Sequence, residues 1–347
     1  MEVSAPGRIC LFGEHQDYLG LPVIAMAISL RAKITGRRRS DHHVIIHKPD
    51  LDESESFSLD DLTYSKPRDY FKSGIVVCQD AGLTFSNGFK CEVSSDIPIR
   101  AGTSSSSAIT VSWIQFLSQM ADTPVNWDQK KIGKLAYKTE VEEFNEPGGM
   151  MDQYTTAMGG LIYLQSEPDI RVRSVKAQLG DFVLGDSNEP KDTMNILLRC
   201  RDTRLEILKK LQKKNIKLDL HYCKDEVNLS DLSTNEKILF KGTIRNRDLL
   251  QQALNELKKK ELDHNNIGRL LSEHHVVLRD VLQLSTPKIE SMLDASLTAG
   301  ALGGKINGSG GGGCMFAYCP GNTKEVALAI ERSGGDAYII NQDTGVI

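Results

Sequence analysis

Residues 98–108 read Pro98-Ile99-Arg100-Ala101-Gly102-Thr103-Ser104-Ser105-Ser106-Ser107-Ala108, and an apolar segment follows directly, as far as Ile114. This pattern predicts a loop that runs into the start of a helix. The first N–H groups of a helix have no partner inside the helix, and this end of the helix dipole is positive. Small residues leave those donors open to a phosphate, and hydroxyls add hydrogen bonds or a ligand for Mg²⁺. A Ser-rich linker or an ordinary helix cap are the alternatives for this stretch alone.

Length and composition describe an ordinary globular chain. It has 347 residues, of which 40% are hydrophobic and 25% charged, and this length is enough for two domains. The net charge of −4 gives no indication of a nucleic-acid or anionic membrane partner. No apolar run is long enough to cross a membrane, and the first residues do not resemble a signal peptide. We therefore expect a cytoplasmic protein that is a monomer or a homodimer.

The cysteines and histidines do not form metal-binding patterns. The seven cysteines include no C-x-x-C pair and are odd in number, which favours free thiols in a reducing compartment over disulfides or a zinc site. The histidine pairs at 42–43 and 274–275 match no metal-ligand spacing. Lysine runs at 209–214 and 258–260 are balanced by nearby acids, so we interpret them as solvated helix faces.

The spacing of apolar residues predicts strands and helices in no strict alternation, which indicates an α+β chain. Strands are expected at residues 2–5, 23–28, 43–47, 89–94, 161–164, 182–184 and 315–318. Helices are expected at 69–83, from the serine run to about 120, and at 128–144, 150–158, 202–217, 246–262, 270–284 and 291–299. Charged helices dominate after about residue 200, so we expect one domain over 1–190 and a second over 191–347.

A polar cluster lies between the first two expected strands. Arg8, Glu14, His15 and Asp17 are close together in this segment and are flanked by glycines. Carboxylates accept hydrogen bonds from sugar hydroxyls, and histidine donates or accepts them. The cluster therefore suits a polyhydroxylated ligand, although a polar turn between strands explains it as well.

Two carboxylates flank the loop at residues 145–149. Glu140 lies on the helix before this loop, and Asp152 lies in the first turn of the helix after it. The loop allows both carboxylates to reach one site, where one holds a metal and the other takes a proton. The alternative is that Asp152 simply complements the helix dipole.

A glycine-rich loop spans residues 303–314 and precedes an apolar strand. So many glycines are destabilising unless the backbone needs a positive φ or a close approach. Residues 308–313 formally match G-x-G-x-x-G, but they precede a strand instead of opening a helix, so the dinucleotide-binding interpretation fails. Tight apolar flanks also argue against a flexible linker.

Together and in this order, these stretches resemble the motifs of the GHMP kinase superfamily, which includes galactokinase, homoserine kinase, mevalonate kinase and phosphomevalonate kinase. Residues 5–18 resemble the first motif, 98–108 the second and 303–314 the third. The chain is most similar to galactokinase. Gly13-Glu14-His15-Gln16-Asp17-Tyr18 resembles its sugar-binding G-E-H-x-D-Y, Met151-Asp152-Gln153 resembles its M-D-Q with the catalytic aspartate, and residues 272–280 resemble a late helix.

The resemblance implies a two-domain α+β fold. The N-terminal domain is expected to be like ribosomal protein S5 domain 2 and the C-terminal domain to be ferredoxin-like, with the active site between them. It also implies ATP- and Mg²⁺-dependent transfer of the γ-phosphoryl group to a monosaccharide, with the anomeric hydroxyl as the expected acceptor.

The same resemblance implies roles for the residues of the three motifs. Asp152 is expected to accept or orient the proton of the sugar hydroxyl, and Arg8 to stabilise the phosphoryl group and keep Asp152 ionised. The expected sugar ligands are Glu14, His15 and Asp17. The expected phosphate ligands are Gly102, Thr103, Ser104, Ser105, Ser106 and Ser107, and the expected Mg²⁺ ligands are Ser106 and Glu140. The loop with Gly308, Gly310, Gly311 and Gly312 is expected to close the site.

Several departures leave the acceptor open. Galactokinases usually have Asn where this chain has Cys10 and Leu where it has Thr103, and residues 185–195 do not resemble the corresponding galactokinase segment. Ser107 stands where alanine is usual, which makes a one-residue shift of the Mg²⁺ ligand an alternative. Heptose, fucose or uronic acid are therefore alternative acceptors. A mevalonate-type kinase and a sugar and nucleotide sensor without catalysis are the other candidates.

Overall fold

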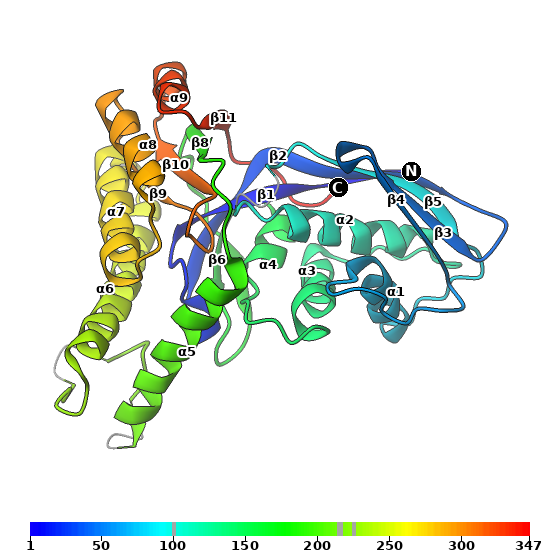
Figure 1. Ribbon diagram of the computed structural model, residues 1–347, viewed down its shortest axis with the longest axis horizontal. Helices are drawn as coiled ribbons and strands as arrows, with labels where there is room; N and C mark the ends of the chain where they lie inside the picture. The colour runs from blue at the N-terminus through cyan, green and yellow to red at the C-terminus, as the bar shows by residue number, and fades with distance from the viewer. Residues whose placement is uncertain (99–101, 214–217, 224–226) are drawn as a thin grey trace.

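A seven-stranded sheet organises the N-terminal half of the computed structural model, which describes residues 1–98, 102–213, 218–223 and 227–347. Along this sheet the order is β4-β3-β5-β2-β6-β7, and β1 pairs with β2 (Figure 1). The strands are β1 (Glu2–Phe12), β2 (Val23–Arg38), β3 (His43–Lys48), β4 (Glu53–Ser58), β5 (Phe89–Ser95), β6 (Leu161–Gln165) and β7 (Arg171–Ser174). All pairs are antiparallel except β3 with β5.

Helices cover one face of this sheet. They are α1 (Tyr70–Asp80), α2 (Ser105–Met120), α3 (Gln129–Tyr137) and α4 (Met151–Met158), and a π-helical turn (Lys138–Glu142) continues α3. The apolar side of α2 packs on β1 and β2, where Trp113 stacks on Phe116 and both rings contact Phe89. This packing fixes the first turn of α2 against the middle of β1, which positions the site described below.

The C-terminal half is built on a four-stranded antiparallel sheet. Its order is β11-β8-β10-β9, with β8 (Phe182–Asp186), β9 (Gly303–Ile306), β10 (Cys314–Tyr318) and β11 (Asp336–Ile340). Its helices are α5 (Thr193–Gln212), α6 (Thr234–Leu257), α7 (His264–Val276), α8 (Pro287–Thr298) and α9 (Thr323–Arg332), and a π-helical turn (Val277–Val281) continues α7. In chain order the strands stand 4-1-3-2, with helices after the first and third, which is the ferredoxin-like arrangement. The predicted two-domain α+β fold is therefore confirmed.

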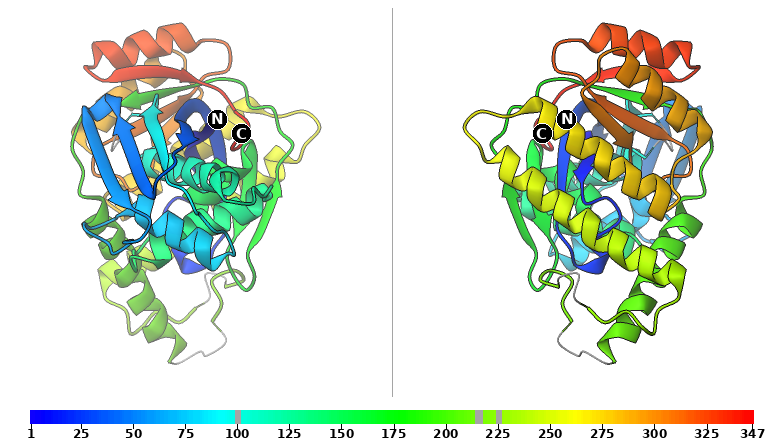
Figure 2. Two further views of the ribbon diagram at one scale, coloured as in Figure 1. Left: turned by 90° about the vertical axis from the view of Figure 1, so that its right-hand side faces the viewer. Right: turned by 90° about the vertical axis from the view of Figure 1, so that its left-hand side faces the viewer.

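The two halves are joined by shared packing and by the end of the chain. The long helices α6 and α7 lie side by side (Figure 2), and their apolar residues pack on the first two strands as well as on the second sheet. After β11 the chain returns to the first sheet, where the backbones of Ser4 and Ile347 hydrogen-bond at 3.0 Å. Strand β8 lies before residue 190 and belongs to the second sheet, so the expected division at 190 does not coincide with the division between the sheets.

Most expected elements are present, although several begin or end elsewhere, and the strands β4, β7, β9 and β11 and the helix α9 were not expected. The first strand continues to Phe12, so that Arg8 lies inside a strand and not in a turn. Helix α5 begins at Thr193 and not at 202, because Asp192 caps it by accepting a hydrogen bond from Asn195 N–H. Helix α6 begins at Thr234 and not at 246, where Ser233 and Glu236 form a capping box. Residues 99–101 of the serine-loop stretch and 214–217 of the predicted helix lie outside the described residues.

The cysteines and the helices were also compared with the expectations from the sequence. All seven cysteines are free thiols, as expected from their number and spacing. Within the described residues, no helix combines the length and the apolar character that crossing a membrane requires.

Candidate active site

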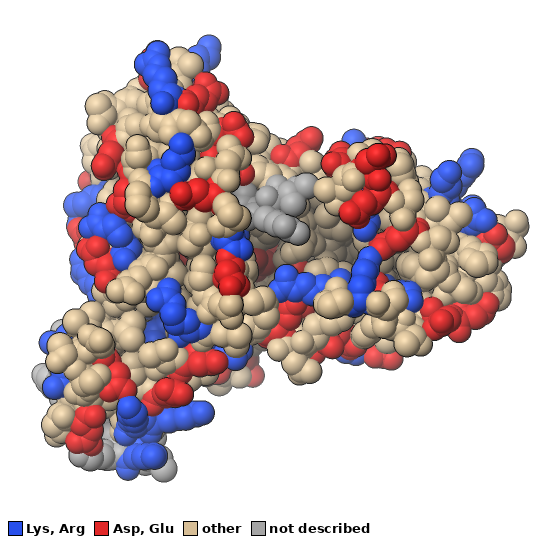
Figure 3. All heavy atoms as spheres, in the orientation of Figure 1, with Lys and Arg blue, Asp and Glu red and all other residues tan. Residues whose placement is uncertain are grey.

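A pocket of about 770 Å³ opens between the two halves of the molecule, where α2 begins. Figure 3 shows this region as a hollow whose lower rim carries Lys, Arg, Asp and Glu side chains. Its lining includes most of the predicted site residues, namely Arg8, Glu14, His15, Asp17, Gly102, Ser104, Ser105, Ser106, Ser107, Glu140, Asp152 and Gly308. Thr103 is not in the lining and is 1% exposed. The structure thus brings together segments that are up to 300 residues apart in the chain.

The start of α2 is an open group of hydrogen-bond donors. Gly102 has a φ of +90°, and Ser104, the residue that precedes the helix, has a φ of +62° and gives the helix no side-chain cap. The hydroxyl of Ser104 is buried without a hydrogen-bond partner among the described residues. The first N–H groups of α2 therefore face the pocket uncapped, as a phosphate-binding helix start requires. The predicted loop and helix start are confirmed, and the phosphate contacts remain predictions.

Arg8 and Asp152 form a bidentate ion pair inside the pocket. Arg8 Nε and Nη2 each donate to Asp152 at 2.8 Å, and the aspartate side chain keeps 29% of its surface exposed. Burial acts against the charged guanidinium, but Asp152 and Glu14 outweigh it, so the pKa of Arg8 is raised further. Asp152 lies in the first turn of α4 and Arg8 in the middle of β1, so both side chains are fixed on rigid elements.

The carbonyl of Gly102 joins this ion pair to the C-terminal half. It accepts hydrogen bonds from Arg8 Nη1 and from Asn307 Nδ2, the latter at 2.8 Å. The Oδ1 atom of Asn307 in turn accepts from the backbone N–H of Cys10 at 2.9 Å. Asn307 is fully buried and follows β9. It therefore holds the phosphate loop and β1 in register, a function that the sequence analysis did not assign to it.

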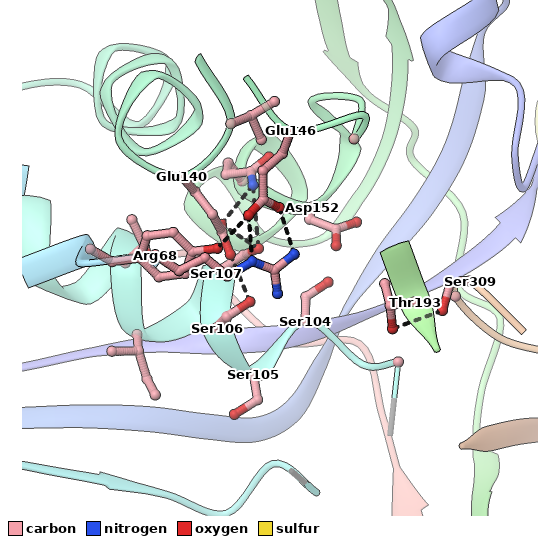
Figure 4. Close-up of a pocket in the computed structure, with 18 of the residues that line it drawn as sticks. Arg68, Ser104, Ser105, Ser106, Ser107, Glu140, Glu146, Asp152, Thr193 and Ser309 are labelled. Atoms are coloured by element: carbon pink, nitrogen blue, oxygen red, sulfur yellow. Dashed lines mark hydrogen bonds and ion pairs between the residues drawn. The ribbon is translucent and has the colours of Figure 1, made fainter. Parts of the chain in front are cut away.

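Glu140 is surrounded by hydrogen-bond donors. Its carboxylate accepts from Ser106 Oγ at 2.6 Å, Ser107 Oγ at 2.7 Å and Gln153 Nε2 at 2.7 Å (Figure 4). Burial raises the pKa of Glu140. The π-helical turn that carries Glu140 is a local feature that often marks functional sites.

The oxygen atoms of Glu140 and its neighbouring serines supply only part of a magnesium coordination shell. Within the described residues, no group of three or more His, Cys, Asp or Glu side chains forms a metal site. One carboxylate and a hydroxyl are what Mg²⁺ uses when substrate phosphates supply the other ligands. The pair Ser106 and Glu140 therefore suits an ion that arrives with a nucleotide.

Asp17 also lines the pocket, and its carboxylate interacts electrostatically with that of Asp152. Its carboxylate accepts from the backbone N–H of Met151 at 3.4 Å. Burial, followed by the negative charge of Asp152, raises the pKa of Asp17 to about 6. Gly149 makes room for it, because a Cβ atom at residue 149 would lie 1.8 Å from Asp17 Oδ2.

His15 is occupied by protein partners. Its Nε2 donates to the carbonyl of Ser309 at 3.0 Å, and its Nδ1 accepts from the hydroxyl of Tyr18 at 2.8 Å. Burial and the nearby Arg204 lower the pKa of His15 to about 3, so the ring is neutral. Arg204 also donates to the hydroxyl of Tyr18 at 2.6 Å. Both ring nitrogens are used, so in this structure His15 positions its neighbours and has no nitrogen left for the predicted hydrogen bond to a sugar.

Glu14 is paired with a lysine that the sequence analysis did not select. Lys305 is fully buried in β9 and donates to Glu14 Oε2 and to the carbonyl of Cys10, both at 2.8 Å. Only Glu14 Oε1 stays free of this ion pair. A single charged residue in an otherwise apolar or glycine strand was the signal for such a buried pair.

The glycine loop before β10 has two parts. Gly308 and Ser309 line the pocket, and Ser309 donates to the hydroxyl of Thr193 on the side opposite Glu140 (Figure 4). Gly310, Gly311 and Gly312 do not line it, which differs from the expectation that they close the site. They have positive φ values and pack closely against Leu284, Ile196 and Glu189, so their structural need is space for neighbouring residues.

A further ion pair crosses the pocket mouth. Arg68 donates from Nη2 to Glu146 Oε2 at 2.8 Å and contacts the sulfur of Met194 at 2.9 Å. The loop before α1, the loop before α4 and the start of α5 therefore meet at this point. No function was predicted for this contact, because Glu146 and Met194 lie 78 and 126 residues from Arg68 in the sequence.

Comparison with known proteins supports the assignment of this site to a kinase family. The model of the GHMP kinases N-terminal domain matches residues 69–160, that of the GHMP kinases C-terminal domain matches 249–336, and the galactokinase galactose-binding signature matches 1–38. A mevalonate kinase of Thermococcus gammatolerans is 30% identical over 97% of this chain and 94% of its own length. A galactokinase of Actinobacillus succinogenes is 27% identical over 92% of this chain and 85% of its own.

Solved structures agree on the fold. The crystal structure of Lactococcus lactis galactokinase complexed with galactose superposes with a TM-score of 0.85 at 23% identity, covering 100% of this chain and 94% of that one. The Methanococcus jannaschii mevalonate kinase has a TM-score of 0.77 at 22% identity, with 99% and 98% covered. With both family domains and the first-strand signature matched in order, the chain belongs to the GHMP kinase family.

Proposed function

We propose that this protein is an ATP-dependent sugar kinase that transfers the γ-phosphoryl group to a monosaccharide hydroxyl, with the anomeric hydroxyl as the acceptor. The observation that carries the proposal is the Arg8–Asp152 ion pair, which lies in one pocket with the uncapped start of α2. A partly exposed carboxylate can accept the proton of an acceptor hydroxyl, and a guanidinium beside it can stabilise the charge of a transferring phosphoryl group.

The proposed reaction forms one bond and breaks one. The hydroxyl oxygen of the sugar bonds to the γ-phosphorus of ATP, while the bond from that phosphorus to the β,γ-bridging oxygen breaks and its electron pair stays on ADP. The hydroxyl proton passes to the carboxylate of Asp152 and then to solvent. Arg8 holds the carboxylate of Asp152 by two hydrogen bonds and offers positive charge to the phosphoryl oxygens. The N–H groups at the start of α2 bind the phosphate chain.

Ser106 and Glu140 would hold a magnesium ion. When bound, Mg²⁺ neutralises charge on the phosphates. Ser106 is the better candidate of the two serines, because Ser107 is 2% exposed and its hydroxyl also lies 3.4 Å from Gln153 Nε2.

The acceptor end of the pocket favours a polyhydroxylated substrate. Asp17 and the free oxygen of Glu14 are hydrogen-bond acceptors, and Lys305 already neutralises Glu14. Sugar hydroxyls donate to such groups, whereas an anionic acceptor would be repelled by the two aspartates. The galactokinase signature over residues 1–38 supports the same acceptor class.

A mevalonate-type kinase is the second candidate. The similarity to archaeal mevalonate kinases favours it, and so does Lys191, a cation in the pocket lining that could take a carboxylate. The two candidates differ in the acceptor and share the phosphate end.

A panel assay separates these candidates. Purified protein is incubated with ATP and Mg²⁺ and with galactose, other hexoses, fucose, a heptose, a uronic acid or R-mevalonate, and ADP release is measured. We expect turnover with a sugar and a new anomeric phosphate in the ³¹P spectrum. Turnover with mevalonate alone would replace the proposal by the second candidate, and ATP binding without turnover on any acceptor would favour a sensor.

We also propose that the enzyme works as a monomer or homodimer in a reducing compartment such as the cytoplasm. Six of its seven free thiols are buried. Burial raises the pKa of Cys91 to about 12, so this thiol is protonated and unreactive.

A further inference from the structure

Lys191 lies against the phosphate loop from the opposite half of the molecule. It belongs to the segment between β8 and α5 and lines the pocket. Its Nζ atom lies 2.7 Å from the point where a Cβ atom at residue 102 would be, and Gly102 there has a φ of +90°. The absence of a side chain at Gly102 therefore gives the ammonium group its place beside the start of α2.

The ammonium group of Lys191 has charged neighbours. Among the residues that the structure describes, none forms an ion pair or hydrogen bond with Lys191 Nζ. The charged and titratable groups that face it are Arg8 on β1, Glu14 after β1, Asp152 on α4 and Cys314 on β10. Burial, and then the positive charge of Arg8, lower the pKa of Lys191 to about 8. A half-buried cation without a direct partner is only partly solvated, so an anion at this point would stabilise the site.

We infer that Lys191 binds the γ-phosphoryl group of ATP together with Arg8 and is a catalytic cation of the transfer. This inference rests on the proposed function. The transferred group spreads negative charge over three oxygens, which one guanidinium and one helix start do not fully surround. Lys191 supplies a point charge at that position, and Gly102 brings it next to the N–H groups that bind the same phosphate chain.

Nucleotide binding without any acceptor tests this role. The affinities for ATPγS and for ADP are measured by calorimetry with Mg²⁺ for the wild type, Lys191→Met, Lys191→Arg and the control Lys130→Met, an exposed lysine at the start of α3. We expect Lys191→Met to lose about tenfold to a hundredfold in ATPγS affinity with ADP affinity unchanged, because a charge-assisted contact to the terminal phosphate is lost. Lys191→Arg should recover part of the loss, and Lys130→Met should match the wild type.

The pH dependence adds a readout that a purely structural role would not move. The charge of Lys191 is lost as the pH rises above about 8, so wild-type ATPγS affinity, relative to ADP, should fall by up to about tenfold per pH unit there. Lys191→Met should lack this dependence, and Lys191→Arg should lack it as well, because its guanidinium stays charged.

Three results would overturn the inference. They are an equal loss of ADP and ATPγS affinity, no loss of either, and an effect on the acceptor KM alone. If Lys191→Met does not fold, the wild-type pH profile and Lys191→Arg still decide the question. Failure of the proposed function would appear differently, as a wild type that distinguishes ATPγS from ADP through Lys191 but phosphorylates no sugar.

Discussion

The two ends of the pocket are held together in different ways. At the phosphate end the ionic and hydroxyl groups pair within the N-terminal domain, as Arg8 with Asp152 and Glu140 with Ser106. At the acceptor end three polar side chains of the loop after β1 are held by the C-terminal domain, whereas Asp17 accepts from Met151 of the N-terminal domain. The pairs there are Glu14 with Lys305, His15 with Ser309 and Tyr18 with Arg204.

Because the two ends are held by different contacts, we expect the rate of phosphoryl transfer and the choice of acceptor to depend on different parts of the molecule. Transfer chemistry needs a fixed phosphate site, and one rigid sheet with its helices supplies most of it, with Asn307 as a clamp from outside. The acceptor loop is shaped by contacts that cross between the domains. We therefore expect changes in the C-terminal domain to alter which acceptor binds, and changes near α2 and α4 to alter how fast transfer occurs.

Asp152→Asn should have the largest effect. The neutral amide cannot take the hydroxyl proton and no longer neutralises Arg8, so kcat should fall on the order of 1,000-fold while ATPγS affinity stays nearly unchanged. Steady-state kinetics and calorimetry measure the two quantities. Asp128→Asn, which keeps an oxygen at the cap of α3, is the control and should retain full activity. A variant with near-wild-type turnover would remove Asp152 from its proposed role.

Lys305→Met tests the acceptor end through stability. It leaves the carboxylate of Glu14 buried without a partner, which should lower the free energy of unfolding by about 3–5 kcal/mol in urea titrations. The double variant Glu14→Gln with Lys305→Met should recover much of this loss. Lys210→Met removes an exposed ion pair with Glu236 and should change the free energy of unfolding very little, because solvent screens this pair. If Lys305→Met lowers the free energy of unfolding no more than Lys210→Met does, the buried pair of Glu14 and Lys305 does not stabilise the acceptor end.

Sequence reasoning found the phosphate end more completely than the acceptor end. The serine run, Asp152 and Arg8 each left an alternative when taken alone, and their expected roles came from the order of the three motifs, which resembles that of the family. Glu14 and His15 were found in the same way, but their availability depends on partners about 290 residues later. No local pattern reveals that both nitrogens of His15 are occupied.

The fold, too, could be predicted from the sequence only where the local pattern was clear. Strands and helices with clear periodicity were predicted, and the ferredoxin-like order followed from the family resemblance. The start of α6 was missed because its first turn is polar, whereas α5 already carries apolar residues at 194 and 196–198, before its expected start at 202. The capping box at Ser233 and Glu236 was the available signal. No sequence signal indicated Lys191, because its position beside Gly102 arises only in the folded structure.

Asp17→Asn tests how much an ionised carboxylate at the acceptor end lowers the stability of the fold. The folded-state pKa of Asp17 is about 6, above its ordinary value of 3.8, so the folded protein loses stability as the pH rises between these values. At pH 8 the ionised carboxylate should cost up to about 3 kcal/mol, and Asp17→Asn should be more stable than the wild type by a similar amount. Near pH 4 the two proteins should be equal. Urea titrations at both pH values measure this, and a less stable variant at pH 8 would contradict it.

Gly149→Ala should give the smallest effect and the most local one. Its Cβ atom would lie 1.8 Å from Asp17 Oδ2, so the carboxylate must move while the ion pair and the start of α2 stay in place. The acceptor KM should rise about tenfold to a hundredfold with the ATP KM unchanged, since small misplacements of a positioning group have effects of this size. Gly148→Ala is the matched control, because its nearest neighbour would be Val141 at 3.9 Å and neither glycine has a positive φ. Equal effects of the two variants, or a change in the ATP KM, would show that the two ends of the pocket are not independent.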